Sequence, residues 1–276
     1  MNDTATPTTT APAGVGVRTF PARRGALLFH SLALARRNLA KVRRNPVSIG
    51  DAVLAPVLFL VVFVYLFGGA VGGSTHAYLQ RTLPAILVLA AIMAGMIATG
   101  VNLSIDIKKG IFDRFRSLPI GRSAPLIGSV LADVVRYLVA VATVFVVGFL
   151  MGFRVQTSPL AALAAAGVTI AFGMALSWVW VLLAMVIRET TLVQTIVSLS
   201  IFPLAFGTDM VAPVDTLPGW LQAWARINPI EHTMAASRGL LIGGDTAVPA
   251  VESLLWSIGL VAVFAPLAVV AYRRRT

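Results

Sequence analysis

The sequence contains no cysteine and only three lysines, and charged residues make up 12% of its 276 positions. The absence of cysteine excludes disulfides and any metal or cluster site with cysteine ligands. None of the lysines follows a glycine, so the chain has no phosphate-cradling loop of its own for ATP. G-x-S-x-G and H-E-x-x-H motifs are also missing, and the three histidines are far apart, so neither a hydrolase site nor a metal site is indicated.

Apolar residues are what the sequence has in abundance, at 58% of the chain. An ordinary soluble domain is about 25% charged, twice the share found here. A soluble protein of this size could not hide so much apolar surface, so the composition indicates an integral membrane protein. The net charge is +11. Because the positive charges lie between apolar runs, the positive-inside rule explains them better than a nucleic-acid partner does.

Six apolar segments predict an all-α membrane protein with six transmembrane helices. They cover residues 47–70, 83–104, 125–153, 160–187, 191–210 and 253–272. Five are long enough to cross a hydrocarbon layer of about 30 Å, and the segment that starts at residue 191 is short. Residues 1–25 are predicted to be a disordered tail, and 26–276 to form one transmembrane domain that opens with an amphipathic surface helix over 26–45.

The distribution of lysine and arginine sets the predicted orientation. With the N-terminus in the cytoplasm, 17 of these residues fall on the cytoplasmic side and four on the outer side. This asymmetry predicts six spans with both termini inside. The outer region 208–251 carries Trp220 and Trp224 one helical turn apart, and the N-P-I-E-H sequence at 228–232 interrupts it. We therefore expect two short helices in the outer leaflet before the last span.

Polar residues inside the spans are candidate functional residues because burying them in a membrane is costly. Asp133 and Arg136 are three residues apart and share a helix face, so they form either a local ion pair or a proton or substrate site. An acid beside an arginine stays ionised, which favours the ion pair. Four uncharged residues either line a translocation path or hydrogen-bond between helices. They are Thr99, Asn102, Gln194 and Ser198.

The loop between the second and third spans is unusually charged and predicts a short amphipathic helix. Ile107, Ile111, Phe115 and Leu118 fall on one stripe, and charged residues fall on the opposite face. Pro119 ends the helix. Such a helix either lies on the membrane surface without a partner or serves as a docking lever, whose aromatic residues fill a groove in a soluble partner.

Two motifs carry a resemblance to a known family. The sequence G-I-F-D-R-F-R-S-L-P at 110–119, followed by Arg122, resembles the cytoplasmic-loop signature of type-2 ABC exporter permeases, especially the daunorubicin-resistance drug-efflux group. The sequence N-P-I-E-H at 228–232, followed by Arg238, is similar to that group's second motif. The six-span plan and the N-terminal surface helix agree, and the resemblance runs from about Arg36 to the C-terminus.

This resemblance implies the membrane subunit of an exporter of a hydrophobic drug, antibiotic or lipid-like compound, in a bacterial inner membrane. Two such permease chains, expected to be a homodimer, would bind two copies of a separate ABC ATPase. ATP and magnesium would reside on that partner, so this chain would be no enzyme and hold no cofactor; membrane lipids are the other expected partner. Residues coupled to the ATPase would be Phe112, Asp113, Arg114, Phe115, Arg116, Leu118 and Pro119.

Two other readings remain open at this point. An ion-coupled secondary transporter would need a titratable carboxylate near the midplane, and Asp133 is the only candidate, with Arg136 beside it. A membrane assembly factor that transports nothing would not need the polar residues of the spans. Co-purification with an ATPase favours the exporter, whereas uptake driven by a pH gradient favours the secondary transporter.

Overall fold

The structure is a computed structural model that describes residues 46–69, 73–110, 124–187, 189–210 and 213–274. Every regular element in these ranges is helical, in keeping with the predicted all-α class. The elements are α2 (Pro46–Phe67), α3 (Thr75–Gly95), η1 (Met96–Val101), α4 (Asn102–Lys108), α6 (Ala124–Leu150), α7 (Pro159–Val186), α8 (Thr190–Phe206), η2 (Val214–Thr216), α9 (Gly219–Ile227), α10 (Pro229–Ile242) and α11 (Ala247–Arg274). The predicted tail 1–25, the surface helix 26–45 and the coupling residues 112–119 lie outside the described residues.

Four helical stretches among the described residues are long and apolar enough to cross a membrane. They are Thr75–Lys108, Leu126–Leu150, Pro159–Val186 and Ala247–Tyr272. The other two predicted spans also coincide with apolar helices, but these are shorter, at Leu54–Phe67 and Thr190–Ala205. The protein is therefore a multi-helix membrane protein in which four of the described helical stretches are each long enough to cross the membrane.

All six predicted segments differ slightly from the helices at their ends, and three differ by four residues or more. The second begins at Thr75 rather than at residue 83, because Ser74 caps the helix by accepting from Ala77 N (3.1 Å) and the polar residues that follow continue it. The fifth does not extend to residue 210. Its helix α8 ends at Phe206, where Asn228 Nδ2 donates to the carbonyls of Leu204 and Gly207. The last helix begins at Ala247, ahead of residue 253.

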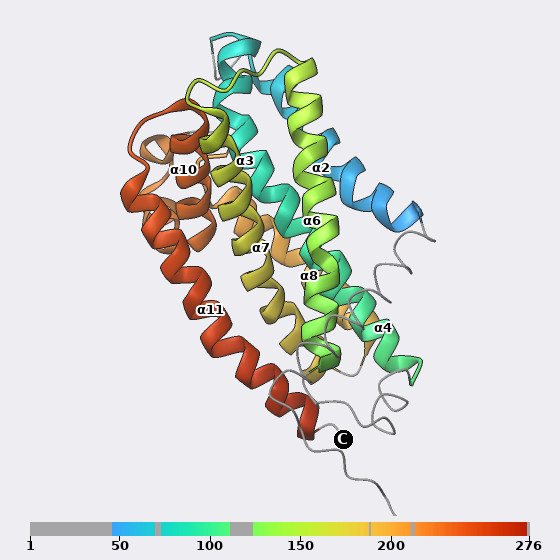
Figure 1. The fold of residues 1–276 in the computed structure, drawn as a ribbon. Coiled ribbons are helices and arrows are strands. Elements are labelled where there is room, and N and C mark those ends of the chain that lie inside the picture. The colour runs from blue at the N-terminus through green and yellow to red at the C-terminus, as the bar shows by residue number, and fades with distance from the viewer. Residues whose placement is uncertain (1–45, 70–72, 111–123, 188, 211–212, 275–276) are drawn as a thin grey trace, which may run out of the picture.

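The α3 helix lies at the centre of the bundle (Figure 1). Nearly every residue from Tyr78 to Gly95 is buried, because α2, α6, α7 and α10 all pack around this helix. By contrast, α11 packs on α7 and α10 along one side only and leaves most of its apolar side chains exposed. In a membrane protein such an apolar outer surface is suited to contact with lipid.

The bundle has two distinct ends, which follow from the alternating direction of the helices (Figure 1). At one end α4 finishes at Lys108, α6 begins at Ala124, and α11 finishes at Arg274. The opposite end holds the connection between α6 and α7 and the region with α9 and α10. The two residues that flank the charged loop, Lys108 and Ala124 at the ends of their helices, therefore lie at the same end of the bundle as Arg274.

The α9 and α10 helices occupy the region where the sequence predicts two short helices. Asn228 joins them, since its Oδ1 accepts from Ile230 N (3.0 Å) and so caps α10. The α10 helix does not rest on the surface, because it packs against α3, α7 and α11, and residues such as Ile230 and Met234 are fully buried. Trp220 on α9 is 74% exposed, in a position suited to the membrane–water interface.

Candidate functional site

A buried polar cluster, the polar centre, is formed by Thr99, Asp133 and Arg136 inside the bundle. Asp133 on α6 is only 4% exposed, and both of its carboxylate oxygens are bonded. Thr99 Oγ1 donates to Asp133 Oδ2 at 2.5 Å, and Arg136 Nη1 donates to Asp133 Oδ1 at 2.9 Å. The spacing of three residues on one helix brings the two charges together, and the threonine brings in a second helix. The ion pair thus lies within α6, and the Thr99–Asp133 hydrogen bond ties α6 to η1.

Tyr137 extends this polar centre toward α7. Its hydroxyl hydrogen-bonds with the Ser177 hydroxyl, and both lie within hydrogen-bonding distance of the Gly173 carbonyl oxygen. Gly95 makes the arrangement possible, because a Cβ there would lie 2.5 Å from Tyr137 Oη. Sequence reasoning missed Tyr137 and Ser177. The sequence signal that could have identified Tyr137 is its position four residues after Asp133, on the same face of a largely apolar span.

The threonine of this centre lies on an irregular part of the central helix. Thr99 belongs to the π-helical segment η1, Met96–Val101, which interrupts the long helix between α3 and α4. Gly100 lets other helices approach at this point, since a Cβ there would lie 3.1 Å from Val197 of α8 and 3.4 Å from Trp180 of α7. Short π segments are frequent at functional sites, which makes this crossing the centre of the candidate site.

The four residues predicted for a translocation path do not form one hydrogen-bonded cluster among the described residues. Thr99 is buried and bonded to Asp133, and Asn102 is half-buried at the start of α4. Gln194 and Ser198 are exposed, one helical turn apart on α8. The buried residues of this part of α8 include Val193 and Val197, each of which directly precedes one of these polar residues. The polar residues of α8 thus face away from the bundle of this single chain.

A second polar cluster lies at the opposite end of the bundle from Lys108. Arg238 on α10 donates to both carboxylate oxygens of Asp209, and Arg81 of α3 lies 3.6 Å from the same carboxylate. Glu231 Oε2 accepts from Asp209 N at 2.8 Å. Burial, together with the nearby Asp209 carboxylate, raises the pKa of Glu231 to about 7. The cluster ties α10 and the end of α8 to the central helix.

Two further predictions concern the coupling residues, which follow α4 in the sequence, and metal binding. The coupling residues Phe112–Pro119 lie outside the described residues, and the structure describes their neighbours Lys108 and Lys109, both exposed at the end of α4. Among the described residues no group of three or more histidine, aspartate or glutamate side chains could hold a metal ion. Lys108 thus ends the same helical stretch, Thr75–Lys108, that carries Thr99.

Comparison with known proteins identifies similar sequences along most of the chain. Residues 30–242 match the family described as ABC-2 type transporter. The chain is 42% identical over 239 residues to the daunorubicin resistance ABC transporter permease protein DrrB1 of Streptomyces coeruleorubidus, which covers 87% of this chain and 84% of that protein. It is 27% identical over 237 residues to the doxorubicin resistance ABC transporter permease protein DrrB of Mycobacterium tuberculosis, over 80% of this chain and 81% of that protein.

Proposed function

Since the chain belongs to the ABC-2 type transporter family, we propose that it is the permease subunit of an ATP-driven exporter of a hydrophobic, drug-like compound. The observation that carries this proposal is the 42% identity to a daunorubicin resistance permease over most of both chains. The absence of a phosphate-binding loop agrees with it, because such a subunit takes its energy from a separate ATPase that holds ATP and magnesium.

We propose that α2 and α8 complete six spans and that two permease chains pair, with α8 at or near their interface. Gln194 and Ser198 are exposed on α8 in this single chain. A polar face turned toward lipid would leave its amide and hydroxyl groups without partners in hydrocarbon. A second permease chain or an aqueous translocation path beside α8 removes that cost. The expected pairing is a homodimer.

Coupling to the ATPase is assigned to the loop that follows α4. Phe112, Phe115 and Leu118 supply an apolar face, and Arg114 and Arg116 supply positive charge beside it. A rigid helix of this kind would transmit closure of the ATPase pair to the spans on either side, α4 and α6. The loop and both termini would then be cytoplasmic, and α9 and α10 would lie on the outer side of a bacterial inner membrane.

The ion-coupled alternative is not favoured. Asp133, its candidate proton carrier, already accepts from Thr99 and forms an ion pair with Arg136. Both of its carboxylate oxygens are therefore already bonded within the bundle. The named relatives are ABC transporter permeases, a class that is driven by ATP.

The coupling role is tested by co-expressing the chain with its ATPase subunit and measuring drug export together with ATPase pull-down. We expect Phe115→Ala and Arg116→Glu to lower both by at least tenfold while membrane insertion is unchanged, because they remove the apolar anchor and reverse the charge. Arg226→Glu, at an exposed arginine of α9, is the matched control and should retain export. Unchanged export and pull-down in both loop variants would refute the coupling role.

The orientation is tested by labelling a single cysteine. The chain has no cysteine of its own, so Thr216→Cys in η2 gives one reactive thiol. We expect a membrane-impermeant maleimide to label it from the outside of intact cells. Labelling from the cytoplasmic side alone would reverse the proposed topology.

A further inference from the structure

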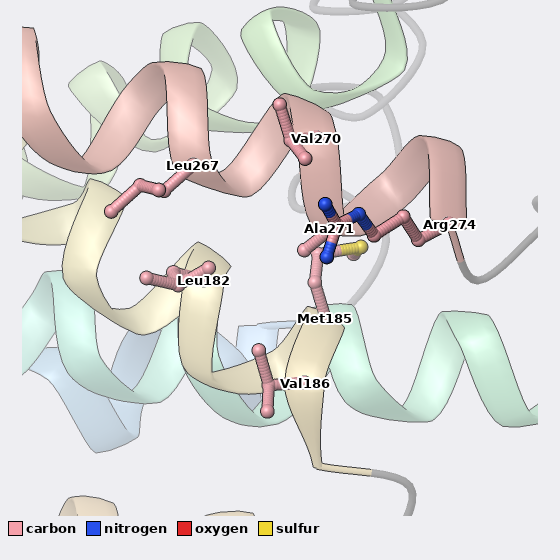
Figure 2. A pocket seen from close by; sticks show the side chains of 7 residues that line it. All are labelled: Leu182, Met185, Val186, Leu267, Val270, Ala271 and Arg274. Carbon is pink, nitrogen blue, oxygen red and sulfur yellow. The ribbon is translucent and has the colours of Figure 1, made fainter.

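An apolar groove runs between α7 and α11 at the end of the bundle where α11 finishes (Figure 2). It has a volume of about 390 Å³. Its apolar walls are Leu182, Met185 and Val186 on α7 and Leu267, Val270 and Ala271 on α11. Val186 is 65% exposed and Leu267 is 47% exposed, so the groove opens sideways from the bundle and not into its core.

Arg274 supplies a cation at one end of this groove. The Arg274 side chain also lines it, and Figure 2 shows this side chain turning back from the end of α11 toward Ala271 and Met185. Arg274 is exposed, and no carboxylate pairs with it in the part of the chain that the structure describes. Within the described residues, the groove thus combines a long apolar wall with a positive charge, on Arg274, that has no carboxylate partner.

We infer that this groove binds an anionic phospholipid, with its phosphate at Arg274 and an acyl chain along α7 and α11. Basic pockets between transmembrane helices at the cytoplasmic surface are suited to acidic headgroups, and long arginine side chains reach the interface readily. The inference rests on the proposed function for its leaflet, because the Arg274 end is cytoplasmic in that orientation.

Other occupants match the groove less well. A free phosphate would contact Arg274 and leave the apolar wall uncovered, whereas a lipid uses both parts of the site. A second permease chain is assigned to the polar face of α8, since an apolar surface needs no protein partner in hydrocarbon. The apolar exposure of Val186, Leu267 and Val270 is what a lipid-facing surface of α7 and α11 requires.

The site is tested by native mass spectrometry of the purified full-length permease with added dioleoylphosphatidylglycerol or dioleoylphosphatidylcholine. We expect the wild type to prefer the anionic lipid, and Arg274→Gln to weaken that preference by about fivefold, the effect of one basic side chain at a membrane surface. Arg226→Gln, an exposed arginine at the far end, is the charge control. Leu267→Trp should reduce retention of both lipids by filling the groove, and Leu255→Trp, at an exposed leucine of the same helix, should not.

Each outcome decides the inference. An unchanged lipid preference in Arg274→Gln would overturn it, as would equal losses in the two arginine variants or the two tryptophan variants. Displacement of the lipid by inorganic phosphate at equal concentration would show an anion site instead. A dimer that dissociates in Leu267→Trp would show that a second chain covers the groove. The measurement needs neither transport nor ATP, so its failure leaves the proposed function standing, and a failed export assay leaves the lipid site standing.

Discussion

Removing one member of the buried ion pair should destabilise the protein strongly. Asp133 is 4% exposed and the Arg136 side chain is 11% exposed, so neither charge has water as a substitute partner. Arg136→Met keeps the length of the side chain but leaves the carboxylate with Thr99 as its remaining bonded partner. We expect the free energy of unfolding to fall by about 3–5 kcal/mol, as for other broken buried pairs.

The paired replacement separates charge from packing. Asp133→Leu combined with Arg136→Met removes both charges and keeps an apolar filling, so it should recover most of the loss. Unfolding by SDS titration in mixed micelles gives the free energies of the wild type, the two single variants and the double variant. Arg154→Met is the control, since this exposed arginine donates only to backbone carbonyls, and it should cost less than about 1 kcal/mol. A double variant no more stable than Arg136→Met would refute this reasoning, as would a single-variant loss below about 1 kcal/mol.

Two further predictions concern the end of the bundle that carries α9 and α10. Asn228→Ala removes the cap of α10 and both hydrogen bonds to the end of α8, so the free energy of unfolding should fall by about 2–3 kcal/mol. The control Thr216→Ala, at an exposed residue, should change it little. Equal stability of the two variants would contradict this prediction. The pKa of Glu231 is raised to about 7 by burial and by the Asp209 carboxylate, so the Glu231 carboxyl binds a proton more tightly in the folded protein than in the unfolded chain. Its stabilising contribution should be complete below about pH 4.5 and be lost as the pH rises through 7. Glu231→Gln should flatten that part of the stability profile, and a steeper fall would refute the assignment.

The sequence predicts the helices of this protein well because apolarity is a direct requirement of the membrane. All six apolar segments coincide with helices. Their ends are harder to predict, because helices continue past the apolar run wherever polar side chains find partners. Arg81 lies outside the predicted second span, yet it is part of α3, since its charge is met by Asp209 from a distant part of the chain. Hydropathy does not include such a long-range partner.

The polar centre was only half predictable for a similar reason. The spacing of Asp133 and Arg136 on one helix is a local property, and it indicates a shared face. The contributions of Thr99 and Tyr137 depend on how α3, α6 and α7 pack, and that packing depends on the absence of a side chain at Gly95. Sequence periodicity shows which face of a helix is apolar but not which neighbouring helix approaches it.

One long helical stretch takes part in three of the polar features described above. From Thr75 to Lys108 this stretch carries Arg81 in the ion cluster with Asp209, Thr99 at the buried ion pair and, at its end, Lys108 before the charged loop. At about 1.5 Å per residue such a stretch extends roughly 50 Å, enough to cross the hydrocarbon layer with its headgroup regions. Its π segment is the irregular part, where Gly100 leaves room for Trp180 of α7 and Val197 of α8. If the charged loop is where an ATPase binds, its displacement also bears on the hydrogen bond between Thr99 and Asp133, since Thr99 lies on the stretch that ends at Lys108 and Asp133 lies on α6. In that case the loop would act directly on α4 and α6, the two helices that it joins, and the Thr99–Asp133 hydrogen bond would couple them a second time inside the bundle.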